Sequence, residues 1–244
     1  MVYPNVCSLH ETVNIEALLK YSAHRTDRRQ AVLDAYVLRH CEQGVREGAL
    51  STICVNYYKK PHYGRLMAKG PAGQKLTREA LAVAFGSHCA ELDAPCCHPR
   101  LLQRQLQQLD IWDPVKFIML DKFIVHYKEW RLCLAEYMNN SLDEAKVELT
   151  RIFYGGKPSV EAPFLLKLCD EVQCAAQMIL RHPSALEWSD LYNDRRNPEF
   201  SRLSAILSVE EAKMLAAIYE DIPELFQVFI FDGGYVNDRH LADQ

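Results

Sequence analysis

The chain lacks any apolar run long enough to cross a membrane, since none of its stretches approaches the roughly 18 residues that a spanning helix needs. Residues 1–14 also lack the basic start and apolar core of a secretory signal. Repeats and low-complexity tracts are absent. What is present, 49% hydrophobic and 25% charged residues among 244, is typical of a soluble globular protein with material for a core. A disordered tail, a collagen-like fibre, a disulfide miniprotein and a transmembrane helix are excluded.

The cysteines lack the spacing of a disulfide framework. There are nine of them, an odd number, and with no signal segment they favour a reducing intracellular compartment. Cys89, Cys96, Cys97 and His98 form one short group. Zinc sites prefer two short-spaced pairs separated by a loop, and the second pair is missing here. We therefore expect buried thiols rather than a zinc site.

Acidic residues are absent between Glu47 and Glu79, although the whole chain has a net charge of −4. The same segment contains four aromatic or imidazole rings, at positions 57, 58, 62 and 63. Basic residues mixed with rings suit a phosphate backbone and stacked bases. A solvated edge strand and loop would explain the charge equally well. The basic residues are Lys59, Lys60, Arg65, Lys69, Lys75 and Arg78.

Hydrophobic periodicity predicts a protein of the α+β class without an evident linker. Ser141 followed by Glu144 is a capping-box signature that opens a helix. We expect a helical N-terminal segment over 1–50 and a core over 51–244, in one domain. Helices are predicted over 14–48, 76–85, 99–109, 114–137, 141–153, 162–180 and 203–222, and strands over 51–58, 89–93 and 225–231.

Two aspartates each end a predicted strand and precede a turn. These are Asp93 and Asp232. If the two strands are neighbours, the carboxylates meet at one end of the sheet, an arrangement that holds two divalent cations for phosphoryl transfer. Magnesium suits such a site because it takes few carboxylates and leaves room for substrate phosphates. Asp-Gly is also an ordinary turn sequence, so this pattern alone is weak.

A predicted helix face carries Lys146, Thr150 and Tyr154 at intervals of four residues. Residues at this spacing lie on roughly one face of a helix. The lysine could hold a triphosphate as a point charge, and the tyrosine could stack on a base. A surface lysine and a C-terminal aromatic residue are the simpler reading of the same pair.

The order of these features resembles the palm and fingers of family A DNA polymerases. A Gly-Arg-Leu segment at 64–66 and the stretch 72–78 precede Asp93, as similar segments precede the first metal-binding aspartate of that family. Lys146, seven further residues and then Tyr-Gly match its second motif, and an apolar strand ending at Asp232 matches its third. The resemblance spans residue 51 to the C-terminus.

The resemblance implies a palm-like antiparallel sheet surrounded by helices, a helical fingers element, and a thumb remnant or cap over 1–50. It implies two Mg²⁺ ions, or Mn²⁺, on Asp93 and Asp232 with the Ala94 carbonyl as a further ligand. The implied partners are a primed DNA template, deoxynucleoside triphosphates and further replication subunits or missing domains. The implied nucleotide-binding residues are Arg78, His98, Lys146, Thr150, Tyr154 and Gly155, and the implied nucleic-acid-binding residues are Lys59, Lys60, Arg65, Lys69, Gln74 and Asn197.

His98 stands five residues after Asp93, where DNA polymerases of the family carry a glutamate that excludes the 2′-hydroxyl. An imidazole is bulky enough to act as the same steric gate, which favours deoxynucleotides. As an alternative, His98 simply opens a helix before Pro99. A phage-type single-subunit RNA polymerase or a primase-like enzyme shares the motifs but usually has a small residue at this position.

The chain departs from the family pattern in several places. Leu142 replaces the usual arginine of the second motif, for which Arg151 or Arg78 could substitute. The third motif lacks its histidine and glutamate, which leaves two carboxylates and Glu91. These departures favour a rival hypothesis, a polymerase-derived module that binds nucleic acid without catalysis. A helical enzyme of unrelated chemistry is a third possibility.

Overall fold

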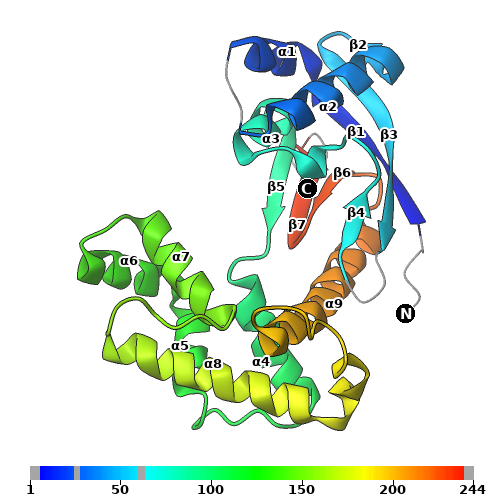
Figure 1. Cartoon of the computed structure of the whole chain (residues 1–244). Helices are drawn as coiled ribbons and strands as arrows, with labels where there is room; N and C mark the ends of the chain where they lie inside the picture. The colour runs from blue at the N-terminus through cyan, green and yellow to red at the C-terminus, as the bar shows by residue number, and fades with distance from the viewer. Residues whose placement is uncertain (1–5, 25–27, 60–63, 239–244) are drawn as a thin grey trace. The chain divides into compact units, whose positions relative to one another are not determined.

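The chain divides into two compact units in the computed structural model, which describes residues 6–24, 28–59 and 64–238 (Figure 1). Unit 1 comprises Met1–Ala94 and Glu211–Gln244, and unit 2 comprises Pro95–Glu210. The mixed α+β class is confirmed, with small antiparallel sheets in unit 1 and helices in both units. The sequence predicted one domain in which a helical segment over 1–50 precedes a core over 51–244. The two units are instead divided after residues 94 and 210.

The first sheet of unit 1 is antiparallel and centres on β3 (Leu50–Lys59), which confirms the strand predicted over 51–58. Its order is β1 (Val6–Asn14), β3 and β2 (Val45–Glu47), and β4 (Leu66–Ala68) also pairs with β3. Strand β3 alternates between the core and the surface, as β-structure with one covered face requires.

Strand β1 was not predicted, because a carboxylate interrupts its apolar alternation. Leu9 and Val13 point into the core, and so does Glu11, which is fully buried between them. The hydroxyls of Tyr36 and Tyr57 donate to its two oxygens at 2.6 and 2.8 Å, and the Gly73 N–H donates at 2.8 Å. Burial raises the pKa of Glu11, and these hydrogen bonds oppose the shift.

The second sheet of unit 1 has the order β5 (Cys89–Asp93), β7 (Gly233–Asn237) and β6 (Phe226–Ile230), all antiparallel. Strands β5 and β6 confirm the predictions. Strand β7 begins with Gly233-Gly234, which we expected to be a turn. A Cβ atom on Gly233 would lie 1.9 Å from the Leu92 carbonyl oxygen, so glycine is needed for close approach of the strands.

The N-terminal helices share one core with both sheets, which is why residues 1–50 do not form a separate segment. The predicted helix over 14–48 is in fact α1 (Ile15–His24) and α2 (Gln30–Gln43), which ends at Gly44 before β2. Helix α3 (Arg78–Phe85) follows a short 3₁₀ turn and packs against α1 (Figure 1). Leu18, Tyr36, Val55, Phe85 and Phe229 are among the shared core residues.

Unit 2 is helical. The helix predicted over 114–137 is two helices, because His126 adopts a non-helical conformation between them. The first, α5 (Ile118–Val125), packs against α8 (Pro163–Arg181), and the second, α6 (Tyr127–Met138), packs against α7 (Leu142–Phe153). The elements are α4 (Cys97–Gln108), α5 (Ile118–Val125), α6 (Tyr127–Met138), α7 (Leu142–Phe153), α8 (Pro163–Arg181), η2 (Pro183–Trp188) and α9 (Pro198–Asp221), which continues into unit 1.

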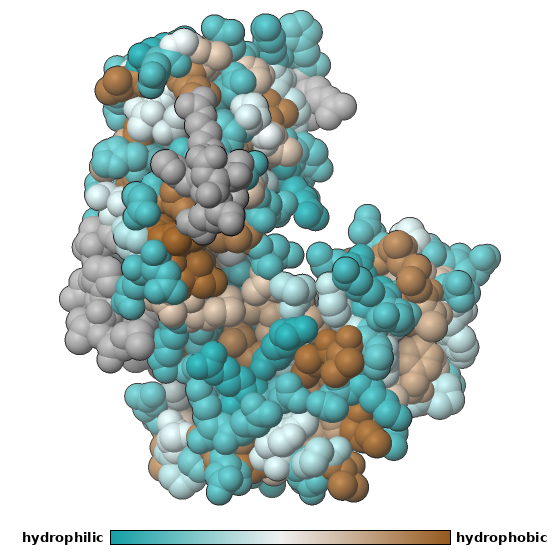
Figure 2. All heavy atoms as spheres, turned by 180° about the vertical axis from the view of Figure 1, so that it is seen from behind, coloured by the Kyte–Doolittle hydropathy of each residue, from teal (hydrophilic) through white to brown (hydrophobic). Residues whose placement is uncertain are grey.

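Seen from behind, hydrophilic residues cover most of the visible face and hydrophobic residues form separate patches (Figure 2). Among residues 6–24, 28–59 and 64–238, no helix combines the length and apolar character needed to cross a membrane.

Candidate functional site

The two strand-end aspartates lie at the same end of the second sheet. Asp93, the last residue of β5, pairs with Gly233 at the start of β7. Asp232 precedes Gly233 in the tight turn from β6 to β7, and the Ala94 N–H donates to the Asp232 carbonyl oxygen at 3.3 Å. The prediction assumed that the strands that lead to these two aspartates, β5 and β6, are neighbours, but β7 lies between them. The hairpin nevertheless returns Asp232 to the end of the sheet where Asp93 lies.

Several charged groups near Asp232 affect the pKa of its carboxyl group. Burial is the main cause that raises the pKa of its carboxyl group, and the carboxylates of Glu211 and Asp93 raise it further. A hydrogen bond from its own backbone and the charge of Arg65 oppose the shift. Asp93, in contrast, is exposed. In the part of the chain that the structure describes, no group of three or more His, Cys, Asp or Glu side chains could hold a metal ion.

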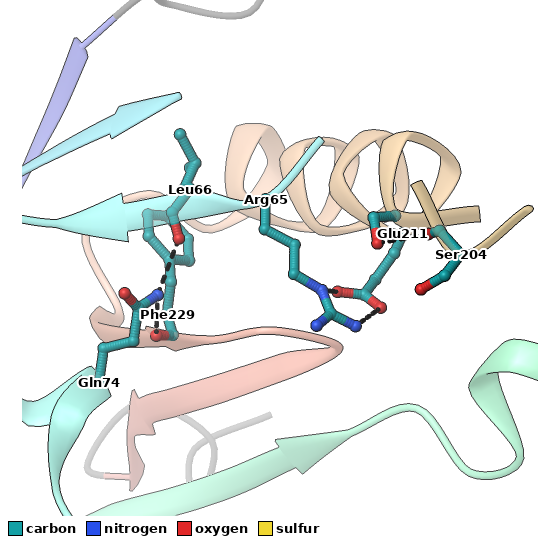
Figure 3. Close-up of polar contacts among 7 residues, drawn as sticks. Arg65, Leu66, Gln74, Ser204, Glu211 and Phe229 are labelled. Carbon is teal, nitrogen blue, oxygen red and sulfur yellow. Dashed lines mark hydrogen bonds and ion pairs between the residues drawn. The ribbon is translucent and has the colours of Figure 1, made fainter. Parts of the chain in front are cut away.

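Arg65 forms a bidentate ion pair with Glu211, a residue of α9 (Figure 3). The Arg65 Nε lies 2.6 Å from Glu211 Oε1, and Nη2 lies 2.7 Å from Oε2. The guanidinium carbon lies 4.7 Å from the ring centroid of Phe231, the residue before Asp232. The side chain of Arg65 is 17% exposed and that of Glu211 is fully buried. Arg65 is thus fixed beside the β6–β7 turn.

Gln74 joins the two sheets of unit 1 through its side-chain amide (Figure 3). Its Nε2 donates to the Leu66 carbonyl at 2.9 Å and to the Phe229 carbonyl at 3.1 Å. Its Oε1 accepts from the Ala68 N–H at 2.9 Å. These bonds link β4 to β6, so direct contact of Gln74 with nucleic acid would require some of them to break.

Replacing Gln74 with leucine should destabilise the fold. The change removes three hydrogen bonds to backbone groups, and we expect a loss of about 2–3 kcal/mol in the free energy of unfolding. Urea denaturation measures it, with Gln107→Leu on the exposed face of α4 as the control. Equal stability of the two variants would contradict the structural role of Gln74.

The predicted face of α7 is present in unit 2. The helix begins at the expected capping box, in which the Ser141 hydroxyl accepts from the Glu144 N–H and the Glu144 carboxylate accepts from the Ser141 N–H. Lys146, Thr150 and Tyr154 are all exposed. The face is therefore accessible along its length, as binding of a ligand would require.

Tyr154, Gly155, His98 and Asn197 lie together within unit 2. The rings of Tyr154 and His98 are 5.3 Å apart between centroids. Gly155 has a φ of +78°, and a Cβ atom there would lie 2.4 Å from Phe200. The Asn197 Nδ2 donates to the Gly155 carbonyl at 3.4 Å, and its Oδ1 accepts from the Phe200 N–H at 3.4 Å. Asn197 thus caps α9 and holds the Tyr-Gly turn.

The lysines predicted to contact nucleic acid are exposed where the structure describes them. Lys59 ends β3, and Lys69 follows β4. The Lys69 ammonium lies 6.0 Å from the ring centroid of Tyr58. Lys60 lies outside the described residues.

The two arginines that could replace the missing arginine of the second motif both have carboxylate partners. Arg78 Nη2 lies 3.8 Å from Glu91 Oε2, in an exposed pair that contributes little to stability. Arg151 Nη1 lies 2.9 Å from Oε2 of the buried Glu148, one turn before it in α7. Both arginines are nevertheless exposed to solvent.

Glu211 is the residue near the candidate site that the sequence reasoning missed. A signal for it exists in α9, because Glu211 lies four residues after Leu207 and four before Leu215, both buried. A charged residue on an apolar helical stripe needs a partner in the core. The partner comes from a segment 146 positions away, so periodicity alone could not name it.

No protein-family model, no curated protein and no solved structure matches the chain. The candidate residues are divided between the two units. Unit 1 holds the aspartates, Arg65, Gln74, Arg78 and the lysines near β3 and β4, whereas unit 2 holds His98, Lys146, Thr150, Tyr154, Gly155 and Asn197.

Proposed function

We propose that the chain is a template-directed nucleotidyltransferase, a DNA polymerase similar to family A that extends a 3′ end with deoxynucleotides. The observation that carries the proposal is the pair formed by Asp93 and Asp232 at one end of a small antiparallel sheet. Paired carboxylates at a sheet end are the recurrent arrangement of two-metal phosphoryl transfer. In this proposal the β5-β7-β6 sheet and its helices form the palm, and the helices of unit 2 form the fingers.

The donor chemistry of the pair fits magnesium or manganese. Both side chains offer hard oxygen atoms, and the Asp232 carboxyl has a raised pKa because it is buried beside other carboxylates. A divalent cation would offset this repulsion. Magnesium is commonly held by one or two carboxylates together with substrate phosphates and water, so a pair suffices. When bound, two such ions supply activation of the 3′-hydroxyl and neutralisation of charge on the leaving pyrophosphate.

The residues of this chain supply binding and orientation. Lys146 would bind the triphosphate of the incoming nucleotide as a point charge. Tyr154 would stack against the base, with its backbone held by the Gly155 turn and by Asn197. Arg65 would lie along the nucleic acid near the primer end, and the exposed Lys59 and Lys69 would contact phosphates.

Primer extension tests the proposal. The protein is incubated with a primed DNA template and Mg²⁺, with deoxynucleotides in one set of reactions and ribonucleotides in another. We expect extension with deoxynucleotides that depends on the divalent ion. If the protein neither extends nor binds the primed template, the proposal is wrong.

A second candidate function is nucleic-acid binding without catalysis. It is favoured by the carboxylate partners of Arg78 and Arg151, the two possible substitutes for the missing phosphate-binding arginine. This candidate expects binding to primed DNA that weakens as salt rises, but no ion-dependent extension. The same reactions distinguish the two candidates.

His98→Gly should admit ribonucleotides if the imidazole is the steric gate. The His98 ring lies beside the Tyr154 ring, and its removal opens space there. We expect the preference for deoxynucleotides over ribonucleotides to fall by about tenfold or more, measured as a ratio of kcat/KM values. His88→Gly in unit 1 is the control. An unchanged ratio in His98→Gly would contradict the gate, and a wild-type preference for ribonucleotides would favour the RNA polymerase alternative.

A further inference from the structure

We propose that Glu211 is a positioning residue that holds the Arg65 guanidinium beside the Asp232 turn in the orientation needed for contact with the primed template. The inference rests on the proposed function, because it gives Arg65 a nucleic-acid partner. It concerns a residue that has no place among the sequence motifs.

The geometry leaves Arg65 little freedom. Glu211 takes the Nε and Nη2 edge of the guanidinium with both of its oxygens, at 2.6 and 2.7 Å. The Nη1 side points away from Glu211 (Figure 3). Phe231 lies against the guanidinium plane, with its centroid 4.7 Å from the central carbon. A planar fork held at one edge and against one face has a fixed orientation.

The backbone that carries Arg65 is fixed by a separate device. Arg65 immediately precedes β4, and the Gln74 amide bonds both the Leu66 carbonyl and the Phe229 carbonyl of β6. Asp232 follows the end of β6 by two residues. Gln74 therefore fixes the backbone at Arg65 relative to the β6–β7 turn. Glu211 fixes the position of the guanidinium at the end of the Arg65 side chain.

A contribution to folding stability does not by itself explain the ion pair between Arg65 and Glu211. A small cavity of about 10 Å³ lies beside Arg65, and its other lining residues are mostly apolar: Leu66, Ala212, Leu215, Phe229 and Phe231. A buried ion pair is often no more stabilising than well-packed apolar residues of similar volume, because both charges lose their hydration. Unlike Glu211, Arg65 remains partly exposed. A buried carboxylate that orients a partly exposed arginine would hold that arginine in position to contact a ligand.

Loss of Glu211 would remove the bidentate contact at 2.6 and 2.7 Å that fixes the guanidinium, so Arg65 would no longer be held in this orientation.

A double-mutant cycle tests the proposal through binding rather than catalysis. The full chain and its Arg65→Ala, Glu211→Gln and doubly substituted variants are titrated with a fluorescent primed DNA in about 150 mM salt without divalent ions, so that long-range charge effects are screened. We expect Arg65→Ala and Glu211→Gln each to weaken binding by about tenfold, and the double variant to bind no more weakly than Arg65→Ala. Arg65→Lys, which keeps the charge but not the fork, should resemble Glu211→Gln.

A matched control separates positioning from general destabilisation. Glu11→Gln makes the same change in another fully buried carboxylate of unit 1, one that contacts tyrosines instead of Arg65. It should leave the Kd unchanged at a temperature where thermal scans show every variant folded. Wild-type affinity in Glu211→Gln, multiplied effects in the double variant, or equal weakening in Glu11→Gln would each overturn the role of Glu211 alone. Absence of binding by the wild-type chain would overturn the proposed function and this role together.

Discussion

Asp232→Asn should abolish extension of primed DNA while leaving the thermal stability of the protein unchanged or higher. An amide is a far weaker ligand for a divalent ion than a carboxylate. Charge stabilisation by such an ion contributes several kcal/mol to the transition state, so extension should fall by about a thousandfold or more. Primer extension and thermal unfolding of the same preparation measure the two effects.

The stability half of this expectation follows from the direction of the pKa shift. Burial and the neighbouring carboxylates raise the pKa of Asp232, so the folded state binds a proton more readily than the unfolded state does. The stability from this group is present at low pH and is lost as the pH rises through the raised pKa. The asparagine does not titrate, so its advantage over wild type should appear at neutral pH and vanish in acid.

Asp93→Asn provides the comparison for Asp232→Asn. Asp93 is exposed at the end of β5, so its substitution should abolish extension with little change in the melting temperature. Full extension by a folded Asp232→Asn variant would remove the aspartate from the catalytic set. Loss of extension together with loss of folding would instead give Asp232 a structural role.

Local patterns predicted those parts of the fold that local forces determine. The capping box at Ser141 begins α7 as expected, because its hydrogen bonds join residues three positions apart. Strand β3 has the expected alternation. The two departures in unit 1 arise from distant partners. Glu11 points inward because Tyr36 and Tyr57 bind its carboxylate, and Gly233 is in a strand because Leu92 approaches it closely.

The candidate site likewise has features that the sequence predicted and features that depend on distant residues. The order of motifs predicts Asp93 and Asp232 as a pair, but it predicts a turn at Gly233-Gly234, where the structure has the start of the strand β7 that pairs with β5. Contact of Gln74 with nucleic acid stays a prediction, and the three hydrogen bonds of its amide to the backbone were not predicted. The pairing of Arg65 with Glu211 depends on the packing of α9 against the β4 segment, which no window of the sequence contains.

Gly233→Ala should destabilise unit 1 more than the same substitution of an exposed glycine, because Gly233 is buried in β7. Its Cβ atom would lie 1.9 Å from the Leu92 carbonyl oxygen and 2.9 Å from the carbonyl carbon, so the backbone of β5 or β7 must move. Overpacking of this kind commonly costs about 1–3 kcal/mol, and a clash with backbone belongs at or above the top of that range. Urea denaturation measures the change.

Gly48→Ala is the control, because a Cβ atom there meets nothing within 4 Å although φ is +60°. It should cost only about 1 kcal/mol, the strain of a left-handed residue. Gly233 also pairs with Asp93 and follows Asp232 in the chain, so any shift that accommodates the methyl group moves one carboxylate relative to the other. Gly233→Ala that is still folded should therefore extend primers poorly, whereas Gly48→Ala should extend them normally. If Gly233→Ala matched Gly48→Ala in both stability and extension, the close approach of β5 and β7 would not be what brings the two aspartates together.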